Sequence, residues 1–129
     1  MTGANKEYKI LLIEDDEIML KVTERILLKE GFKVIVAQNG KEALQKVEEK
    51  DYDMVITDLM MPYANGFEII SKIKGDSYGA NIPIIIVSSL GNEDSIMEGF
   101  RLGVDDFLKK PIMAGELLIR VKRLLARKL

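Results

Sequence analysis

The chain has 129 residues, of which 47% are hydrophobic and 31% are charged, the balance of one ordinary globular domain with its own core. Its formal net charge of −2 gives no overall attraction to nucleic acid or to an anionic membrane surface, so neither is expected as a direct partner. Cysteine and histidine are absent, which excludes disulfides, thiol chemistry, a phosphohistidine on this chain and histidine metal ligands.

The chain shows neither a membrane span nor a targeting signal. No apolar stretch is long enough to cross a bilayer. Residues 1–7 are too short and too polar for a signal peptide, and they are predicted to form a flexible lead before a single domain at residues 8–129. We therefore expect a cytoplasmic protein.

Short apolar runs alternate with amphipathic stretches along the whole chain, and each pair predicts a strand followed by a helix. In chain order, the predicted elements are a strand at 8–13, a helix at 16–30, a strand at 32–37, a helix at 41–50, a strand at 53–57, a helix at 66–74, a strand at 83–87, a helix at 92–102, a strand at 105–108 and a helix at 113–128. No repeat or linker interrupts this alternation.

The first predicted helix carries an apolar stripe and a stop signal. Met19, Val22, Ile26 and Leu27 are expected to face the core. Gly31 follows the helix and is expected to end it, because glycine readily takes the backbone conformation found just past a helix C-terminus.

Five continuous apolar strands, each followed by a helix, predict an α/β fold with a parallel sheet covered on both faces. We expect a flavodoxin-like, doubly wound, five-stranded sheet with strand order 2-1-3-4-5 and five helices. In that order the first and third strands are neighbours, and ligands bind at the carboxyl ends of the strands. Residues that directly follow these strands are therefore the candidate site.

Acidic residues follow two of the neighbouring strands. Glu14 and Asp15 end the first strand and Asp58 ends the third, so their carboxylates should lie close together and repel one another unless a cation is bound. Mg²⁺ suits such a place, with Mn²⁺ as a second choice. We assign Asp15 and Asp58 as direct ligands, the backbone carbonyl of Met60 as a third and Glu14 as a ligand through water. The alternative for Asp15 and its neighbour Asp16 is capping of the helix that follows.

A lysine and a serine complete the predicted site. Lys110 follows the fifth strand, and its long side chain can reach Asp58, neutralise the acidic cluster and hold a phosphoryl oxygen. Ser88 supplies a hydroxyl at the end of the fourth strand. Taken alone, Asp58 and Ser88 are ordinary residues for the ends of strands, and it is the combination with Lys110 that indicates phosphoryl transfer.

Four segments of the chain together resemble the receiver domain of the bacterial two-component response-regulator family, of the chemotaxis-regulator type. The segments are residues 10–17, residues 58–62 with Asn65 and Gly66, residues 83–88 and residues 103–111. They occur in the family's order and spacing over nearly the whole chain. The resemblance implies that Asp58 is the phosphoacceptor and that Lys110 and Ser88 are catalytic. It also implies a Mg²⁺-dependent transfer from a sensor histidine kinase or a histidine phosphotransfer protein, and a cis peptide between Lys110 and Pro111.

The resemblance also implies a switch. Ser88 moves toward the phosphoryl group and Phe107 swings inward, which changes the surface of the fourth helix, fifth strand and last helix for a downstream target protein or output domain. A homodimer through the same surface is a further expectation, with Asp105 and Asp106 facing Arg120 and Arg123; a solvated basic face is the alternative. Gly99 lowers the stability of the fourth helix by about 0.5–1 kcal/mol, which suits a mobile element.

Two positions that tune loss of the phosphoryl group in the family are apolar here, Met60 and Leu90. Neither side chain can orient an attacking water, so we expect slow self-dephosphorylation. The chain would then catalyse its own phosphorylation and slow dephosphorylation without turning over an external substrate.

Other functions of the same fold class fit less well. A flavin carrier needs a phosphate-binding loop after the first strand, where this chain has four consecutive acids. An aspartate-nucleophile phosphatase usually has a second aspartate two residues after the first, where Met60 stands. A receiver-like interaction module that is never phosphorylated remains the alternative, and both a stand-alone regulator and one domain of a larger regulator remain open.

Overall fold

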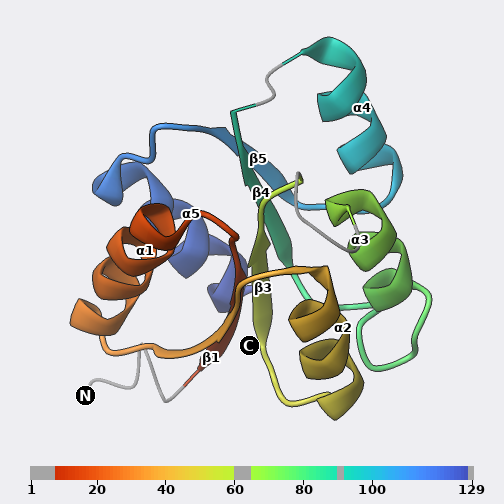
Figure 1. Cartoon of the computed structure of the whole chain (residues 1–129), viewed down its shortest axis with the longest axis horizontal. Helices are drawn as coiled ribbons and strands as arrows, with labels where there is room; N and C mark the ends of the chain where they lie inside the picture. Colours follow the sequence, from red (N-terminus) through yellow and green to blue (C-terminus); the bar gives the residue numbers. More distant parts are fainter. Residues whose placement is uncertain (1–7, 60–64, 90–91, 128–129) are drawn as a thin grey trace.

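The structure is a computed structural model that describes residues 8–59, 65–89 and 92–127. The predicted flexible lead at residues 1–7 lies outside the described residues. Strands and helices alternate from end to end (Figure 1). In chain order they are β1 (Lys9–Ile13), α1 (Glu17–Lys29), β2 (Lys33–Ala37), α2 (Gly40–Glu49), β3 (Met54–Thr57), α3 (Gly66–Lys74), β4 (Ile84–Ser88), α4 (Glu93–Arg101), β5 (Asp106–Lys109) and α5 (Ala114–Ala126).

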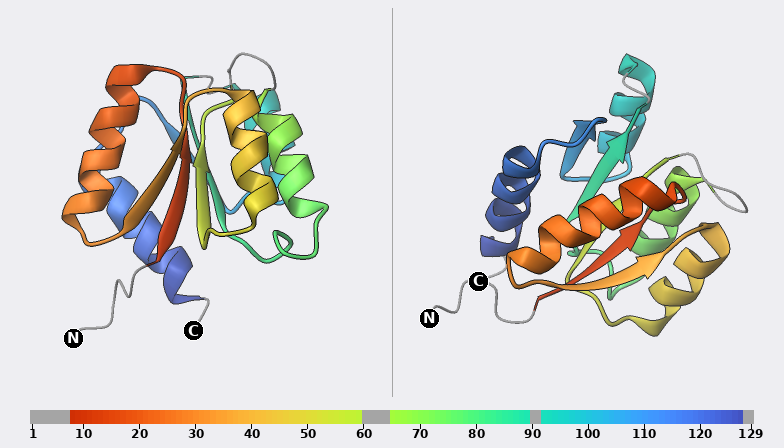
Figure 2. Two further views of the ribbon diagram at one scale, coloured as in Figure 1. Left: turned by 60° about the horizontal axis from the view of Figure 1, so that its bottom comes forward. Right: turned by 60° about the vertical axis from the view of Figure 1, so that its left-hand side comes forward.

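The five strands form one parallel sheet in the order β2-β1-β3-β4-β5, which confirms the predicted fold class. α1 and α5 cover one face of this sheet, and α2 and α3 cover the other (Figures 1 and 2). The three inner strands, β1, β3 and β4, are therefore buried on both sides, which explains why they are continuous apolar runs rather than alternating ones.

Alternate residues of each strand supply two separate cores. In β1, Ile10 and Leu12 pack with α1 and α5, whereas Leu11 and Ile13 pack with α2 and α3. This period of two is the ordinary pleat of a strand. This alternation matters for the site because it decides which of the two cores the side chain at the end of a strand faces.

Short polar side chains fix the starts of four helices. Asp16, Asn39, Asn65 and Asn92 each accept a hydrogen bond from the backbone N–H three residues further on. Such caps satisfy backbone donors that have no partner inside the helix. The cap of α1 is thus Asp16, not Asp15.

The inner face of α1 differs from the prediction at several residues. Of the four residues expected to face the core, only Leu27 is buried, Met19 and Ile26 are partly buried, and the buried Leu20 and Thr23 were not predicted. Val22 was expected to face the core but is 45% exposed, and the buried residues of α1 are Leu20, Thr23 and Leu27. These three follow a regular helical spacing, but the polar Thr23 conceals the stripe in the sequence. The stop at Gly31 is confirmed, with φ of 94°.

The other predicted boundaries agree to within a few residues. β4 and β5 each begin and end one residue later than predicted, a difference typical of element ends. Within the described parts of the chain, no helix is both long enough and apolar enough to span a bilayer.

Candidate functional site

The candidate site lies at the carboxyl edge of the sheet, where backbone hydrogen bonds continue beyond the strands. The N–H of Glu14 donates to the carbonyl of Ala37 (3.0 Å), and the N–H of Asp58 donates to the carbonyl of Ile13 (3.0 Å). On the far side, the N–H of Lys110 donates to the carbonyl of Ser88 (2.9 Å). The residues that carry the candidate chemistry are therefore held by the sheet ladder itself.

Three carboxylates meet at this edge. One oxygen from each of Glu14, Asp15 and Asp58 lies within 4.8 Å of the other two. Glu14 and Asp58 are buried, with 4% and 7% of their surface exposed, whereas Asp15 is exposed. Oxygen ligands of this kind, partly open to water, are those that Mg²⁺ takes in proteins. The donor set fits a small hard divalent cation.

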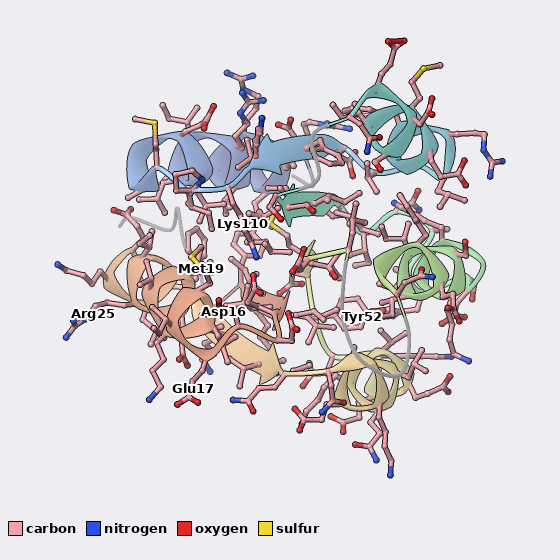
Figure 3. All side chains as sticks on the ribbon, turned by 45° about the horizontal axis from the view of Figure 1, so that its top comes forward. Asp16, Glu17, Met19, Arg25, Tyr52 and Lys110 are labelled. Atoms are coloured by element: carbon pink, nitrogen blue, oxygen red, sulfur yellow. The ribbon has the colours of Figure 1, made fainter. Side chains whose placement is uncertain are left out.

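Lys110 joins two of these carboxylates. Its Nζ lies 2.8 Å from Oε1 of Glu14 and 3.3 Å from Oδ2 of Asp58, and its side chain is mostly buried. Figure 3 shows Lys110 over the middle of the sheet, with Asp16 close by at the start of α1. The Lys110–Pro111 peptide bond is cis, as the resemblance implied.

The charges of Glu14 and Lys110 depend on each other. Burial raises the pKa of Glu14, and the charge of Asp58 adds to this, while the hydrogen bonds from Lys110 and from the N–H of Asp16 act against it. Burial alone would lower the pKa of Lys110, but its bonds to Glu14 and the charges of Asp58 and Glu14 outweigh that effect, so its pKa is raised. Lys110 is therefore a cation at neutral pH.

Asp58 is held by its own backbone neighbours. Its Oδ1 accepts the N–H of Leu59 (2.7 Å), and its backbone carbonyl accepts the Thr57 hydroxyl (2.8 Å). Its Oδ2 faces Lys110. One carboxylate oxygen is thus fixed by the peptide that follows and the other by a cation.

Gly66, at the start of α3, is a site residue whose role the sequence reasoning missed. A Cβ on Gly66 would lie 2.5 Å from the carbonyl oxygen of Asp58 and 2.8 Å from Cα of Leu59. Its N–H donates to the carbonyl of Leu59 (2.8 Å). Only glycine permits this approach, and the available signal was a glycine directly after the capping Asn65.

The two predicted switch residues lie on adjacent strands. Ser88 is the last residue of β4 and is fully buried, while Phe107 in β5 is partly buried and packs against the core beneath α2 and α3. Ile86 of β4 is the register partner of Phe107, and Ser88 is the partner of Lys109. Met60, the predicted carbonyl ligand, and Leu90, the second tuning position, lie outside the described residues.

Acidic residues at and just before the start of β5 pair within the chain with basic residues in and just after α5. Arg120 binds both carboxylate oxygens of Asp106 (2.8 and 2.9 Å), and Arg127 lies 3.6 Å from Asp105. A dimer that used Arg120 in the way the resemblance suggests would have to exchange this internal pair.

A large cavity of about 610 Å³ lies far from the acidic cluster, at the opposite edge of the sheet. Its charged groups already have partners in the chain. Lys74 donates to the carbonyl of Ile82 (2.7 Å), and Arg127 faces Asp105. The side chains at the carboxyl edge therefore identify it as the candidate site, although the cavity lies at the opposite edge of the sheet.

Known proteins with similar sequences and structures share this arrangement of elements. Residues 10–122 match the family model described as response regulator receiver domain. The CpxR-homologue transcriptional regulatory protein of Haemophilus influenzae is 40% identical over 119 residues, which cover 92% of this chain and 51% of that protein. The Francisella response regulator 1452 receiver domain is 34% identical, with a TM-score of 0.87, and the match covers 95% of this chain and 99% of that chain.

A second similar structure contains a metal. The receiver domain of the sensor histidine kinase PA1611 from Pseudomonas aeruginosa, with a magnesium ion coordinated in its active site cleft, is 26% identical and has a TM-score of 0.85. The match covers 92% of this chain and 98% of that chain. This chain spans about half the length of the curated relatives it matches. Because the family model covers most of the chain, the chain belongs to the receiver domains of two-component response regulators.

Proposed function

We propose that this chain is a phosphoacceptor in which Asp58 takes a phosphoryl group from the phosphohistidine of a partner, a sensor histidine kinase or a histidine phosphotransfer protein. The observation that carries the proposal is the buried contact of Lys110 with both Glu14 and Asp58, at the edge where Asp15 also lies. Burial of these charged groups costs desolvation free energy, and clusters of this kind concentrate at functional sites. This phosphoryl transfer is proposed to take place in the cytoplasm.

In the proposed step, a carboxylate oxygen of Asp58 attacks phosphorus. The new P–O bond forms as the P–N bond to the partner's imidazole breaks, and the departing imidazole keeps a proton and leaves neutral. Lys110 neutralises one phosphoryl oxygen, and the Ser88 hydroxyl donates to another. The N–H of Leu59 fixes the carboxylate before the reaction (2.7 Å), so that little reorganisation is needed.

The residues present also fit a divalent cation. Asp15 and Asp58 would hold Mg²⁺ or Mn²⁺ directly, Glu14 through water and Met60 through its carbonyl. The ion would supply charge neutralisation for the incoming phosphoryl oxygens.

The proposed output is the surface made by α4, β5 and α5. Ser88 moving toward the phosphoryl group and Phe107 moving inward would change this surface. It presents large exposed apolar side chains, with Met97 61% exposed, Phe100 47% and Ile119 60%. We propose that it binds a downstream target protein or an output domain, and that a homodimer forms through it. The relatives of about twice this length are transcriptional regulators, which favours an output domain as the partner.

Intact-mass spectrometry with acetyl phosphate, with and without Mg²⁺, tests the phosphoacceptor proposal. One phosphoryl group is expected on the wild type only when Mg²⁺ is present, and none on Asp58→Ala. A beryllofluoride titration that changes the amide spectrum of the wild type but not of Asp58→Ala would support the same site. If neither reagent acts on the wild type, nor a phosphoramidate donor, the chain is instead a receiver-like interaction module.

A further inference from the structure

The attachment of α4 to the rest of the molecule depends on a residue without a side chain. Gly99 is the buried residue of α4, whereas Met97 and Phe100 on either side point outward. In Figures 1 and 2, α4 stands at the outer edge of the molecule, beyond α3. The backbone of Gly99 also takes part, since its carbonyl accepts the N–H of Val104 (3.1 Å). α4 thus touches the sheet by its backbone at this residue.

The space above Gly99 is already filled by residues of β4, β5 and the turn between α4 and β5. A Cβ built on Gly99 would lie 2.9 Å from Cδ1 of Ile86, 3.4 Å from Cγ2 of Val104 and 3.8 Å from Cδ2 of Phe107. Cδ1 is the end of the Ile86 side chain, but Ile86 is fully buried, so this methyl group can move aside only if neighbouring core side chains shift with it. The closest contact is therefore a clash with the core, and the ring of Phe107 is within van der Waals reach.

Ile86 links this contact to the candidate phosphorylation site. Ser88 is two residues further along β4, so its side chain points to the same face of the sheet as that of Ile86. Ile86 is also the register partner of Phe107 on β5. Gly99 of α4 thus lies over Ile86, the strand residue that is next to both predicted switch side chains.

We propose that Gly99 sets the distance between α4 and the β4–β5 pair and thereby makes α4 respond to the position of Phe107. This inference rests on the proposed function, because it names the contact through which a change at Ser88 and Phe107 reaches the α4 surface. A side chain at this position would hold α4 away from the sheet whatever the state of Asp58. Phosphorylation would then cause a smaller change in the position of α4.

Two substitutions isolate the contact. Gly99→Ala adds the methyl group that meets Ile86, although alanine is the better helix former. Ile86→Val removes Cδ1, the atom that the new methyl group would approach most closely. The double variant Gly99→Ala with Ile86→Val should therefore restore the docking of α4. Gly115→Ala in α5 is the matched control, because a Cβ there has nothing within 4 Å.

Hydrogen–deuterium exchange of α4 (residues 93–101) measures the docking, before and after acetyl phosphate with Mg²⁺. Before phosphorylation, Gly99→Ala should speed exchange in α4 roughly three- to tenfold, the range expected for one disturbed core contact. The double variant should return to within about twofold of Ile86→Val alone, as expected for coupled neighbours. The change in α4 exchange on phosphorylation should shrink in Gly99→Ala and return in the double variant, while Gly115→Ala behaves like the wild type.

Two results would overturn the inference. If α4 of Gly99→Ala exchanges no faster than in Gly115→Ala, the side-chain space over Gly99 does not control docking. If the double variant fails to recover, Ile86 is not the contact that matters. Failure of the proposed function looks different. In that case, the wild type takes up no phosphoryl group and its α4 exchange stays constant, while the comparison of unphosphorylated variants still reports on Gly99.

Discussion

At the scale of single residues, the position of Lys110 decides what the acidic cluster can do. Its Nζ lies closer to Glu14 (2.8 Å) than to Asp58 (3.3 Å). Glu14 therefore anchors the lysine beside Asp58, and the lysine makes only a longer contact with the phosphoacceptor itself. A cation held in this way is placed before the reaction, which is how preorganised charges lower a barrier.

Replacement of Lys110 by methionine is expected to slow phosphorylation of Asp58 by acetyl phosphate about 10²-fold or more, the usual effect of losing one preorganised charge partner. Quantitative intact-mass time courses with Mg²⁺ measure the rate. Lys109→Met is the control, because Lys109 is exposed and adjacent in sequence. An equal loss in both variants would show that general surface charge, not the position of Lys110, is responsible.

Gly66→Ala is expected to reduce both stability and phosphorylation. The added methyl group would lie 2.5 Å from the carbonyl of Asp58, so the peptide that carries the phosphoacceptor must shift. A loss of about 1–3 kcal/mol in the free energy of unfolding is expected from such overpacking. Urea unfolding measures it. Gly115→Ala, which meets no atom within 4 Å, should instead leave the stability unchanged or raise it by less than the roughly 0.5–1 kcal/mol expected in a helix interior, because Gly115 is the second residue of α5.

Titration of the Tyr52 hydroxyl is expected to lower the free energy of unfolding at high pH. Burial, followed by the charges of Tyr78, Asp76 and Glu48, raises its pKa from 10.0 to about 12. The folded state therefore binds this proton more tightly than the unfolded state does. The resulting stability is fully present below pH 10 and is lost as the pH rises through about 12.

The expected loss from Tyr52 is on the order of 2 kcal/mol in the free energy of unfolding. Urea unfolding at several pH values between 9 and 12 measures it. Tyr52→Phe keeps the ring that packs edge-on against Tyr78, with centroids 5.3 Å apart, and should flatten this part of the curve. A slope that is unchanged in Tyr52→Phe would assign the titration to other groups.

At the scale of secondary-structure elements, local hydrogen bonds determine where the helices begin. Asn39 accepts the N–H of Glu42 (2.9 Å), and Glu42 reaches back to accept the N–H of Gln38 (2.9 Å). This reciprocal arrangement satisfies two backbone donors at the start of α2. Asn39 and Glu42 bond to backbone N–H groups at the start of α2 and not to the three carboxylates, so the stability of α2 can be changed without removing a group of the candidate site.

Asn39→Ala should lower the free energy of unfolding by about 1 kcal/mol, because the orphaned N–H of Glu42 loses its acceptor. Thermal or urea unfolding checks the value, and phosphorylation of Asp58 should stay at the wild-type rate. Asn39→Asp is the control, since aspartate caps as well as asparagine. A loss of the same size with aspartate would mean that the side-chain oxygen is not what stabilises α2.

The sequence was sufficient for the elements and their order, but not for all contacts between them. Apolar runs such as 84–87 identify strands because burial on both faces demands them. Thr23 could not be recognised as a core residue, since its type is polar and its burial of 98% depends on tertiary packing. The clash that requires Gly66 depends on the path of the Asp58 backbone. The Glu14–Lys110 pair depends on side-chain reach from the end of β5 past β4 and β3 to the end of β1. Neither is encoded in local spacing.

At the scale of the whole molecule, the lifetime of the phosphorylated form sets how long a signal lasts. Met60 and Leu90 are apolar at the positions that tune phosphoryl loss in the family, so the phosphoprotein should decay slowly in isolation. Intact-mass spectrometry after removal of the donor follows the decay. Met60→Asn, which restores a polar side chain, should shorten the lifetime. A wild-type half-life of seconds would contradict the prediction.

The alternation of side chains along β4 has a consequence for how this domain can be altered. Ile85 and Val87 belong to the core shared with α1 and α5, whereas Ile86 and Ser88 face the side of α4. Substitutions on the two faces of β4 should therefore have different effects. Substitutions at Ile85 and Val87 would change mainly the stability of the fold, whereas substitutions at the fully buried Ile86 and Ser88 would change both the stability and the sensitivity of the response. To change the response of such a regulator, a protein engineer would substitute residues on the face of β4 that carries Ile86 and Ser88.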